Sequence, residues 1–296
     1  MASIKHSFNP ATDIPPLNNK VILITGANTG LGKQTALELA QHSPAQIWLT
    51  SRDFTKGQTA VEEVQKIASP GTKIHLLQLD LSSFASIKSA AKTFLSSVSR
   101  LDILFLNAGV LGHPPALTDE GYEIHMGTNH LGHALLLKLL TPLLNKTSQE
   151  TPGGPSRVVS LTSIGYRLSD SSIHFHKLRQ PDGLPQILRY IQSKLANLLY
   201  AKEVAKRYRE SKIVSVHPGE VDTELFSREP GDEQVRFLVE EVAPKRVGSL
   251  EEGVKNQIWA AVAEVESGAY YEPVGRRAEE GLANDVVMAR MLWEWT

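Results

Sequence analysis

The chain has 296 residues, of which 41% are hydrophobic and 21% charged, and its formal net charge is −1. This balance is ordinary for a soluble globular protein, and it gives no electrostatic reason to expect nucleic acid or an anionic membrane as a partner. The absence of cysteine excludes disulfides, thiolate catalysis and cysteine-ligated zinc.

Residues 1–19 contain Pro10, Pro15 and Pro16 among polar residues, and no apolar run is long enough for a signal peptide or a membrane span. We therefore interpret this segment as an irregular N-terminal extension and expect a cytoplasmic protein with no membrane span. Residues 20–296 are expected to form a single domain, because α/β chains of this length often build one continuous sheet.

The first regular element is the apolar run Val21–Ile24, which is typical of a strand buried on both faces of a parallel sheet. A turn with Gly26, Gly30 and Gly32 follows it, and a helical pattern continues over 33–40. Glycines let a backbone approach a pyrophosphate closely, and the start of a helix offers free N–H groups to it. The pattern predicts a dinucleotide-binding turn, with a plain glycine loop as the alternative.

The second strand, predicted over 46–50, leads into Ser51, Arg52 and Asp53. At this place a carboxylate binds the ribose 2′-hydroxyl of NAD, whereas a cation accommodates the 2′-phosphate of NADP. Arg52 therefore favours NADP(H). Asp53 leaves the choice less clear, and a solvated surface arginine remains the alternative.

Apolar strand patterns and helical patterns then alternate along the chain. The strands are predicted over 74–79, 101–106, 158–163 and 213–216, and the helices at about 83–95, at about 121–144 and around Tyr190. This alternation predicts an α/β fold, a doubly wound parallel sheet of the Rossmann type with three α/β/α layers.

Unusual residues fall at or within two residues of the strand ends. They are Gly26, Arg52, Asp80, Asn107, Ser163 and Pro218. Because open α/β sheets bind ligands outside the carboxyl ends of their strands, we expect these residues to line one crevice.

Tyr190 and Lys194 are four residues apart on a predicted helix, so the ammonium group should lie against the phenol ring. A phenol beside a fixed cation can act as a proton donor. Tyr208 and Lys212 have the same spacing, but Lys212 opens the apolar run 213–216, which would put that pair at the amino end of a strand.

Several motifs resemble, in order and approximate spacing, those of the short-chain dehydrogenase/reductase family. They are Thr25-Gly26-x3-Gly30-x-Gly32, Asp80-Leu81, Asn107-Ala108-Gly109, Asn129, Ser163, Tyr190-x3-Lys194 and Pro218-Gly219-x-Val221-x-Thr223. The resemblance covers about residues 20–271. Arg52, the sequence Leu195-Ala196-Asn197 and the long segment before Tyr190 are similar to the retinol-dehydrogenase-like branch.

The resemblance implies four catalytic residues. Tyr190 would be the general acid in reduction and the base in oxidation, and Lys194 would also bind the nicotinamide ribose. Ser163, rather than the adjacent Thr162, would hydrogen-bond the substrate oxygen, and Asn129 would hold a water that links the lysine to solvent. We expect Lys194 and the oxidised nicotinamide to lower the pKa of the phenol from about 10 toward about 7.

The implied cofactor contacts are Gly26, Asn28, Thr29, Gly30, Leu31, Gly32, Arg52, Asp80, Leu81, Asn107, Ala108, Gly109, Tyr190, Lys194, Pro218, Gly219, Val221 and Thr223. The expected protein is an NADP(H)-dependent oxidoreductase, a monomer or homo-oligomer, that acts on a small-molecule substrate and interconverts a ketone or aldehyde and the corresponding alcohol. The alternatives are a catalytically silent dinucleotide-binding protein, a family member whose chemistry is not net redox, and a methyltransferase on a similar sheet, which would not need the Tyr-x3-Lys motif.

No metal site is expected. His125, His130 and His133 are close in sequence but lack an acidic partner at metalloenzyme spacing, and helix-surface histidines are the better account.

The polar stretch 220–247 is interpreted as a substrate lid. Phe175, Phe226 and Phe237 are candidates for apolar walls or for core packing. The stripe of Met288, Met291, Leu292 and Trp295 is interpreted as a packing face, because it is too short to span a membrane.

Overall fold

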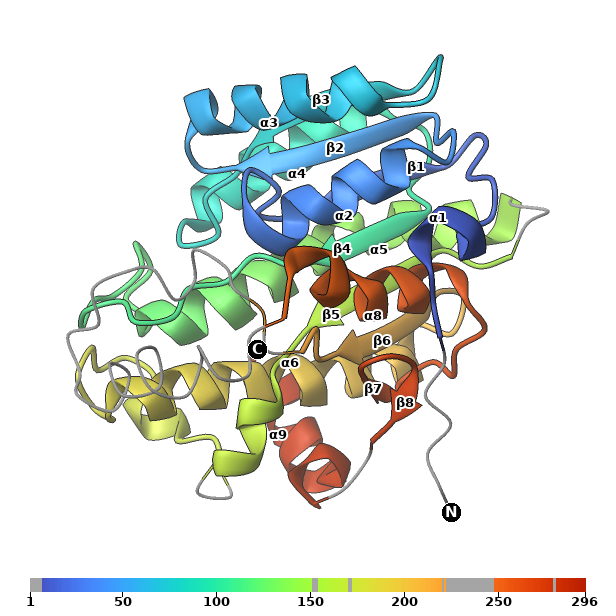
Figure 1. The fold of residues 1–296 in the computed structure, drawn as a ribbon. Coiled ribbons are helices and arrows are strands. Elements are labelled where there is room, and N and C mark those ends of the chain that lie inside the picture. The colour runs from blue at the N-terminus through green and yellow to red at the C-terminus, as the bar shows by residue number, and fades with distance from the viewer. Residues whose placement is uncertain (1–6, 151–153, 170–171, 220, 222–247, 279–280) are drawn as a thin grey trace.

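The fold of the computed structural model is a single eight-stranded sheet with helices on both faces (Figure 1). The structure describes residues 7–150, 154–169, 172–219, 221, 248–278 and 281–296. The strand order is β3-β2-β1-β4-β5-β6-β7-β8, so the chain crosses over after β3 and builds the second half of the sheet on the other side of β1. This is the doubly wound α/β fold that the sequence predicted.

The strands are β1 Val21–Ile24, β2 Gln46–Ser51, β3 Lys73–Gln78, β4 Ile103–Leu106, β5 Arg157–Leu161, β6 Lys212–Val216, β7 Tyr270–Glu272 and β8 Arg276–Arg277. All neighbouring strands pair in parallel except β8, which is antiparallel to β7. The sequence predicted the first six strands and missed the last two, because runs of three and two residues are too short to show a hydrophobic pattern.

The described α-helices are α1 Pro10–Asp13, α2 Gly30–Ala40, α3 Phe54–Ile67, α4 Phe84–Ser97, α5 Gly132–Glu150, α6 Gln186–Arg207, α8 Leu250–Val262 and α9 Val286–Trp295. Short helices η1 Met126–Leu131, η2 Ile164–Leu168, η3 Phe175–Lys177 and η6 Gly281–Asn284 lie between them.

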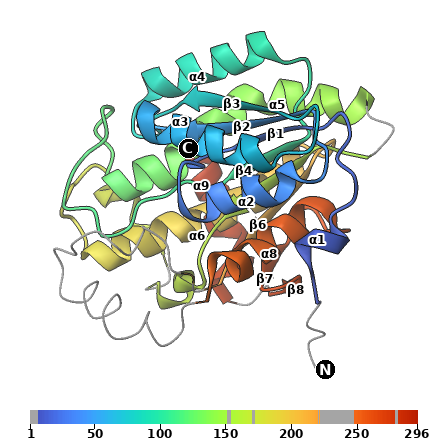
Figure 2. The same cartoon turned by 45° about the horizontal axis from the view of Figure 1, so that its top comes forward.

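The side chains of the central strand β1 pack into two hydrophobic cores, one on each face of the sheet. Ile22 and Ile24 pack with residues of α2, α3 and α8, whereas Val21 and Leu23 pack with residues of α4, α5 and α6. Successive side chains of a strand point to opposite faces, so a continuous apolar run is what two covered faces require. Figure 2 shows α4 and α2 on opposite sides of β1 and β2.

A third apolar cluster joins α9 to α6 (Figure 1). Leu292 is buried there, and Met288 and Trp295 pack against the cluster, as the predicted stripe requires. Met291 departs from the stripe and is 48% exposed. Phe175 also joins this cluster, with its ring centroid 5.7 Å from that of Trp295, so its described contacts are those of core packing.

Residues 7–19 contain regular structure within the segment that was expected to be irregular. It contains the one-turn helix α1, which Asn9 caps by accepting from Ala11 N, and the side chains of Phe8, Ile14 and Leu17 are buried in the main core. Four residues of helix are too few for a periodic pattern, which is why the sequence did not reveal it.

The helix predicted over 121–144 is interrupted. Residues Met126–Leu131 form one stretch of π-helix before the regular helix α5 begins at Gly132. The start of α5 lies very close to the turn after β3: a Cβ added at Gly132 would be 2.3 Å from the Leu81 carbonyl oxygen. A π-helical stretch carries about one extra residue per turn, so the spacing of hydrophobic residues in the sequence does not predict it.

The histidines near this π-helix are buried, so the expectation that they lie on the helix surface was wrong. The exposed fractions of His125, His130 and His133 are 0%, 1% and 3%. Each ring has at least one hydrogen-bond partner inside the protein, which is how a polar side chain becomes acceptable in a core. Burial lowers the pKa of His130 to about 4 and that of His133 to about 3.

The lid predicted over 220–247 lies outside the described residues apart from Val221, and so do Thr223, Phe226 and Phe237. In the described part of the chain, no helix combines the length and the apolar character needed to cross a membrane.

The buried histidines predict acid-labile stability. Their folded pKa values lie below the unfolded value near 6.5, so the unfolded chain binds protons first, and the stabilisation is complete above pH 6.5 and is lost as the pH falls toward 4. Each histidine should remove up to about 1.4 kcal/mol of unfolding free energy per pH unit in that window. Urea unfolding from pH 7 to pH 5 measures the slope. It should be shallower in His130→Leu, and an unchanged slope would contradict the assignment.

Candidate active site and cofactor pocket

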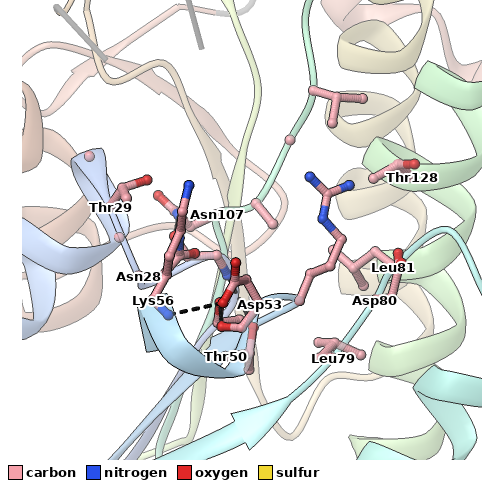
Figure 3. A pocket seen from close by; sticks show the side chains of 18 of the residues that line it. Asn28, Thr29, Thr50, Asp53, Lys56, Leu79, Asp80, Leu81, Asn107 and Thr128 are labelled. Carbon is pink, nitrogen blue, oxygen red and sulfur yellow. Dashed lines mark hydrogen bonds between the residues drawn. The ribbon is translucent and has the colours of Figure 1, made fainter. Parts of the chain in front are cut away.

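A pocket of about 350 Å³ opens at the carboxyl ends of β1, β2, β3 and β4 (Figure 3). Twelve of the residues predicted from the sequence as cofactor contacts line it. They are Gly26, Asn28, Thr29, Gly30, Leu31, Gly32, Arg52, Asp80, Leu81, Asn107, Ala108 and Gly109. Four of the six strand-end residues expected in one crevice line this pocket: Gly26, Arg52, Asp80 and Asn107. Ser163 and Pro218 are not among its lining residues. The volume of the pocket falls in the range of ligand pockets.

Several further lining residues were not predicted as contacts. They are Thr50, Ser51, Asp53, Lys56, Leu79, Val110, Leu111 and Thr128. Most are chain neighbours of predicted residues. Lys56 could have been found, because it stands one helical turn after Arg52 at the start of α3. Thr128 could not, because it reaches the pocket from the π-helix.

The turn at the end of β1 leaves no room for a side chain at Gly26 or Gly32. A Cβ added at Gly32 would be 2.4 Å from the Gly26 carbonyl oxygen and 2.6 Å from Asn107 Nδ2, and Gly26 itself has a φ of +63°. The helix α2 begins at Gly30 with no side-chain cap from Thr29. Its first N–H groups and its positive dipole end are therefore available to a phosphate.

Asp53 is committed to a structural contact. It is the N-cap of α3, and its Oδ1 accepts from the backbone N–H of Lys56 at 3.0 Å, the dashed line in Figure 3. Arg52 directly follows β2 and Lys56 lies in the first turn of α3, and both are exposed and line the pocket. The pocket lining therefore includes two basic side chains and a carboxylate that caps a helix, a composition suited to an anionic group.

Tyr190 and Lys194 lie on α6 as predicted, with Lys194 Nζ 5.8 Å from the centroid of the phenol ring. Both side chains are buried, at 8% and 5% exposed. Lys194 Nζ donates to the Leu161 carbonyl at the end of β5, at 3.3 Å, and burial lowers its pKa to about 8. Tyr208, whose spacing to Lys212 is the same, is the C-cap at the far end of this helix.

The pKa of Tyr190 differs from the value expected for the working enzyme. Burial raises it to about 12, and the hydrogen bond with Ser163 only partly opposes this rise. A cation at 5.8 Å from the ring centroid is too distant to reverse the desolvation of a phenolate. In the protein alone Tyr190 is therefore a protonated phenol, and any lowering toward 7 must come from a bound charge.

The choice between Thr162 and Ser163 follows from their partners. The Thr162 hydroxyl donates to the Lys194 carbonyl at 2.6 Å and fixes α6 against β5. Ser163 Oγ accepts from Gly165 N at 3.1 Å and hydrogen-bonds with Tyr190. Ser163 is thus the hydroxyl beside the phenol, whereas Thr162 serves the packing of the helix.

Asn129 is fully buried in the π-helix and connects the pocket to α6. Its Oδ1 accepts from Val110 N at 2.8 Å, and its Nδ2 donates to the Val110 carbonyl at 3.1 Å and to Ser193 Oγ at 2.9 Å. A Cβ added at Gly109 would be 3.3 Å from Lys194 Nζ and 3.4 Å from Asn129 Oδ1. Gly109 therefore brings the pocket wall against both side chains.

Pro218 and Gly219 follow the end of β6, and Gly219 has a φ of +101°. Val221 is buried and forms an isolated parallel bridge with Gly248. The structure thus describes three members of the last motif, Pro218, Gly219 and Val221, while Thr223 lies outside the described residues. The described residues contain no group of three histidine or acidic side chains that could hold a metal ion.

Comparison with known proteins decides the family. Residues 20–165 match the model of the short chain dehydrogenase family. Human retinol dehydrogenase 11 is 35% identical over 293 residues, which are 97% of this chain and 88% of that protein. The chain belongs to the short-chain dehydrogenase family. A mouse retinol dehydrogenase 11 is 43% identical over 211 residues, covering 71% of this chain and 64% of that protein. An uncharacterized oxidoreductase of Schizosaccharomyces pombe is 35% identical, covering 99% and 87%.

Solved structures show the same fold. An uncharacterized protein from Mycobacterium paratuberculosis has 28% identity and a TM-score of 0.73, covering 98% of this chain and 96% of that one. The NADPH-bound carbonyl reductase from chicken fatty liver has 24% identity and a TM-score of 0.66, covering 92% and 98%. This short-chain dehydrogenase is thus an enzyme of an oxidoreductase family that binds a nicotinamide dinucleotide.

The close approach within the glycine turn gives a test of the pocket in this dehydrogenase. Gly32→Ala should lower both the melting temperature and the affinity for a nicotinamide dinucleotide, the latter at least about tenfold, because the Gly26 turn and Asn107 must move. Gly71→Ala is the control. Its φ is +88° and nothing lies within 4 Å, so it should cost stability alone. Fluorescence titration and thermal unfolding measure the two effects, and unchanged affinity in Gly32→Ala would contradict this use of the turn.

Proposed function

We propose that this protein is an NADP(H)-dependent oxidoreductase that interconverts a ketone or aldehyde and the corresponding alcohol, with Tyr190 as the general acid and base. The observation that carries the proposal is the convergence of Tyr190, Ser163, Lys194 and Asn129 beside the pocket. Relatives named retinol dehydrogenase are in keeping with alcohol and carbonyl chemistry. Family membership excludes the methyltransferase alternative. The experiments below distinguish an active enzyme from a catalytically silent dinucleotide-binding protein.

The described residues fit a nicotinamide dinucleotide. The glycine turn and the start of α2 suit its pyrophosphate, because Gly26 and Gly32 allow a tight turn and no side chain caps the first N–H groups of α2. When bound, the nicotinamide supplies or accepts the hydride, and the protein contributes position and charge. Similar folds are known with NADPH and with NADH, so the preference must be argued from this chain.

Arg52 and Lys56 support NADP(H). Both line the pocket, and the carboxylate of Asp53, which would otherwise suit a ribose hydroxyl, is held by the N–H of Lys56. Charge-assisted contacts from two cations would stabilise a 2′-phosphate and leave NADH without that gain.

In the reducing direction the phenol of Tyr190 gives its proton to the carbonyl oxygen while the carbonyl carbon receives the hydride. Ser163 would hydrogen-bond the same oxygen and stabilise the negative charge that develops there. With pKa values of about 12 for Tyr190 and about 8 for Lys194, the acid form and the neighbouring cation coexist below pH 8. Lys194 then stabilises the phenolate that remains after proton transfer.

The central prediction is that Tyr190→Phe abolishes turnover but not binding. The substitution keeps the ring and removes the transferable proton, so NADPH affinity should barely change while the single-turnover rate falls by about two to four decades. Stopped-flow absorbance at the nicotinamide band measures the rate on any carbonyl compound that the wild type reduces.

Tyr208→Phe is the matched control for that experiment. Tyr208 has the same spacing to a lysine but lies at the C-cap of α6, so its variant should keep the wild-type rate within a small factor. Near-wild-type turnover in Tyr190→Phe would exclude it as the proton donor. A wild type that binds NADPH and reduces none of a broad panel of aldehydes and ketones would favour the silent binder.

The cation pair predicts a cofactor preference. NADPH should bind about one to two decades more tightly than NADH, and Arg52→Ala should remove most of the difference. Lys56→Ala should remove a further part, whereas Lys66→Ala, in the last turn of the same helix, should leave the ratio unchanged. Titration of both cofactors by fluorescence gives the ratios. Equal affinities in the wild type would end the NADP(H) assignment.

A further inference from the structure

The hydroxyl of Thr25, at the end of β1, is a buried junction below the cofactor pocket. Its oxygen accepts from the backbone N–H groups of Asn107 at 2.9 Å and Ala108 at 3.0 Å, two residues that line the pocket. The same oxygen lies 2.9 Å from His133 Nε2 and 3.2 Å from the Phe105 carbonyl. A hydroxyl has two lone pairs and one hydrogen, so the two N–H groups leave it only the hydrogen to give.

The partners of His133 determine which of its nitrogens carries the hydrogen. Its Nδ1 lies 2.9 Å from the backbone carbonyl oxygen of Asn129, which can only accept. Nδ1 therefore donates, and in the neutral ring Nε2 is an acceptor. The Thr25 hydroxyl then gives its hydrogen to His133 at 2.9 Å in preference to the Phe105 carbonyl at 3.2 Å.

The ring is held in this neutral form. His133 is 3% exposed, and burial lowers its pKa to about 3. A protonated ring would point a second N–H at an oxygen whose lone pairs already accept from Asn107 and Ala108. Geometry and desolvation thus select one tautomer across the working pH range.

A closed circuit of contacts results. It runs from Thr25 through the backbone of 107–110 to the Asn129 side chain, which binds both backbone groups of Val110, and from the Asn129 carbonyl through His133 back to Thr25. The turns that line the cofactor pocket and the π-helix that carries Asn129 therefore share one set of hydrogen bonds.

We propose that His133 is a positioning residue that couples the cofactor-binding turn at 107–109 to Asn129 by fixing the direction of the Thr25 hydroxyl. Without its acceptor, this hydroxyl turns to the Phe105 carbonyl, and its lone pairs no longer face the two N–H groups equally. The pocket wall and the Asn129 carbonyl then lose their common support. The effect on catalysis rests on the function proposed above, whereas the hydrogen-bond assignment does not.

His130 provides a matched comparison. It belongs to the π-helix that directly precedes α5 and His133, and it is 1% exposed. Its two nitrogens contact Asn197 Oδ1 at 3.3 Å and Thr296 Oγ1 at 3.0 Å. Truncation of either ring to leucine removes two buried hydrogen bonds, so the general cost in stability is similar. An effect specific to His133 must then come from the Thr25 circuit.

The first experiment needs no cofactor. In ¹⁵N-resolved NMR spectra at pH 7, His133 should show the neutral Nδ1–H tautomer. In His133→Leu, the amide hydrogens of Asn107 and Ala108 should exchange at least about fivefold faster than in the wild type, and His130→Leu should leave them within twofold. A protonated ring, an Nε2–H tautomer, or equal exchange in the two variants would overturn the assignment.

The second experiment tests the coupling by NADPH fluorescence titration. His133→Leu should weaken affinity about five- to tenfold and His130→Leu by less than twofold. Thr25→Val should weaken it similarly, Thr25→Ser should restore it, and the double variant Thr25→Val with His133→Leu should be no weaker than Thr25→Val alone. Multiplying effects in the double variant would overturn the shared circuit.

Two outcomes separate this inference from the proposed function. If the wild type binds no NADPH, the proposed cofactor is wrong, and the exchange rates decide the role of His133 by themselves. If His133→Leu does not fold, His133→Gln takes its place, with an amide that can still donate to the Asn129 carbonyl. Its Asn107 and Ala108 exchange rates should lie between those of the wild type and Thr25→Val, and exchange at the wild-type rate would overturn the coupling.

Discussion

Parallel pairing about β1 is the constraint on which the site depends. Ile24 pairs with Phe105, and Leu161 pairs with Val216, so the residues just beyond these strands arrive at one edge of the sheet. Gly26, Asn107, Ser163 and Pro218 belong to that edge. Where the backbone turns at this buried edge, its N–H groups must find hydrogen-bond acceptors. The Thr25 hydroxyl meets that need for two of them.

Burial of the side chains that we propose as catalytic divides the electrostatic stabilisation between protein and ligand. It raises the pKa of Tyr190 to about 12 and lowers that of Lys194 to about 8, so each group is driven toward its neutral form. The protein therefore holds Tyr190 as a protonated phenol, with Ser163 beside it, and does not by itself favour the phenolate. A positively charged ligand in the adjoining pocket would favour the phenolate most in the dry surroundings that burial creates.

The sequence predicted the fold and most of the pocket because both follow from features that are local in the chain. Apolar runs marked six strands, and glycines, Arg52 and Asp80 stood at their ends. It did not predict the caps and burial that depend on tertiary neighbours: the commitment of Asp53 to α3, or the burial of His130 and His133. The π-helix at 126–131 also escaped, since one extra residue in a turn leaves the hydrophobic pattern almost unchanged.

A buried ion pair joins the start of the π-helix, which carries Asn129, to α6, which carries Tyr190. Glu123, 1% exposed, accepts from Met126 N at 2.9 Å at the start of the π-helix and from Arg189 at 3.2 Å on α6, beside Tyr190. Arg189 also donates to the Pro181 carbonyl at 2.9 Å. Desolvating two charges offsets most of their attraction, so the pair adds little stability. The pair instead fixes the position of one helix relative to the other, because its hydrogen bonds are directional. An apolar contact would tolerate sliding of one helix along the other, whereas these bonds fix the position of Asn129 relative to Tyr190.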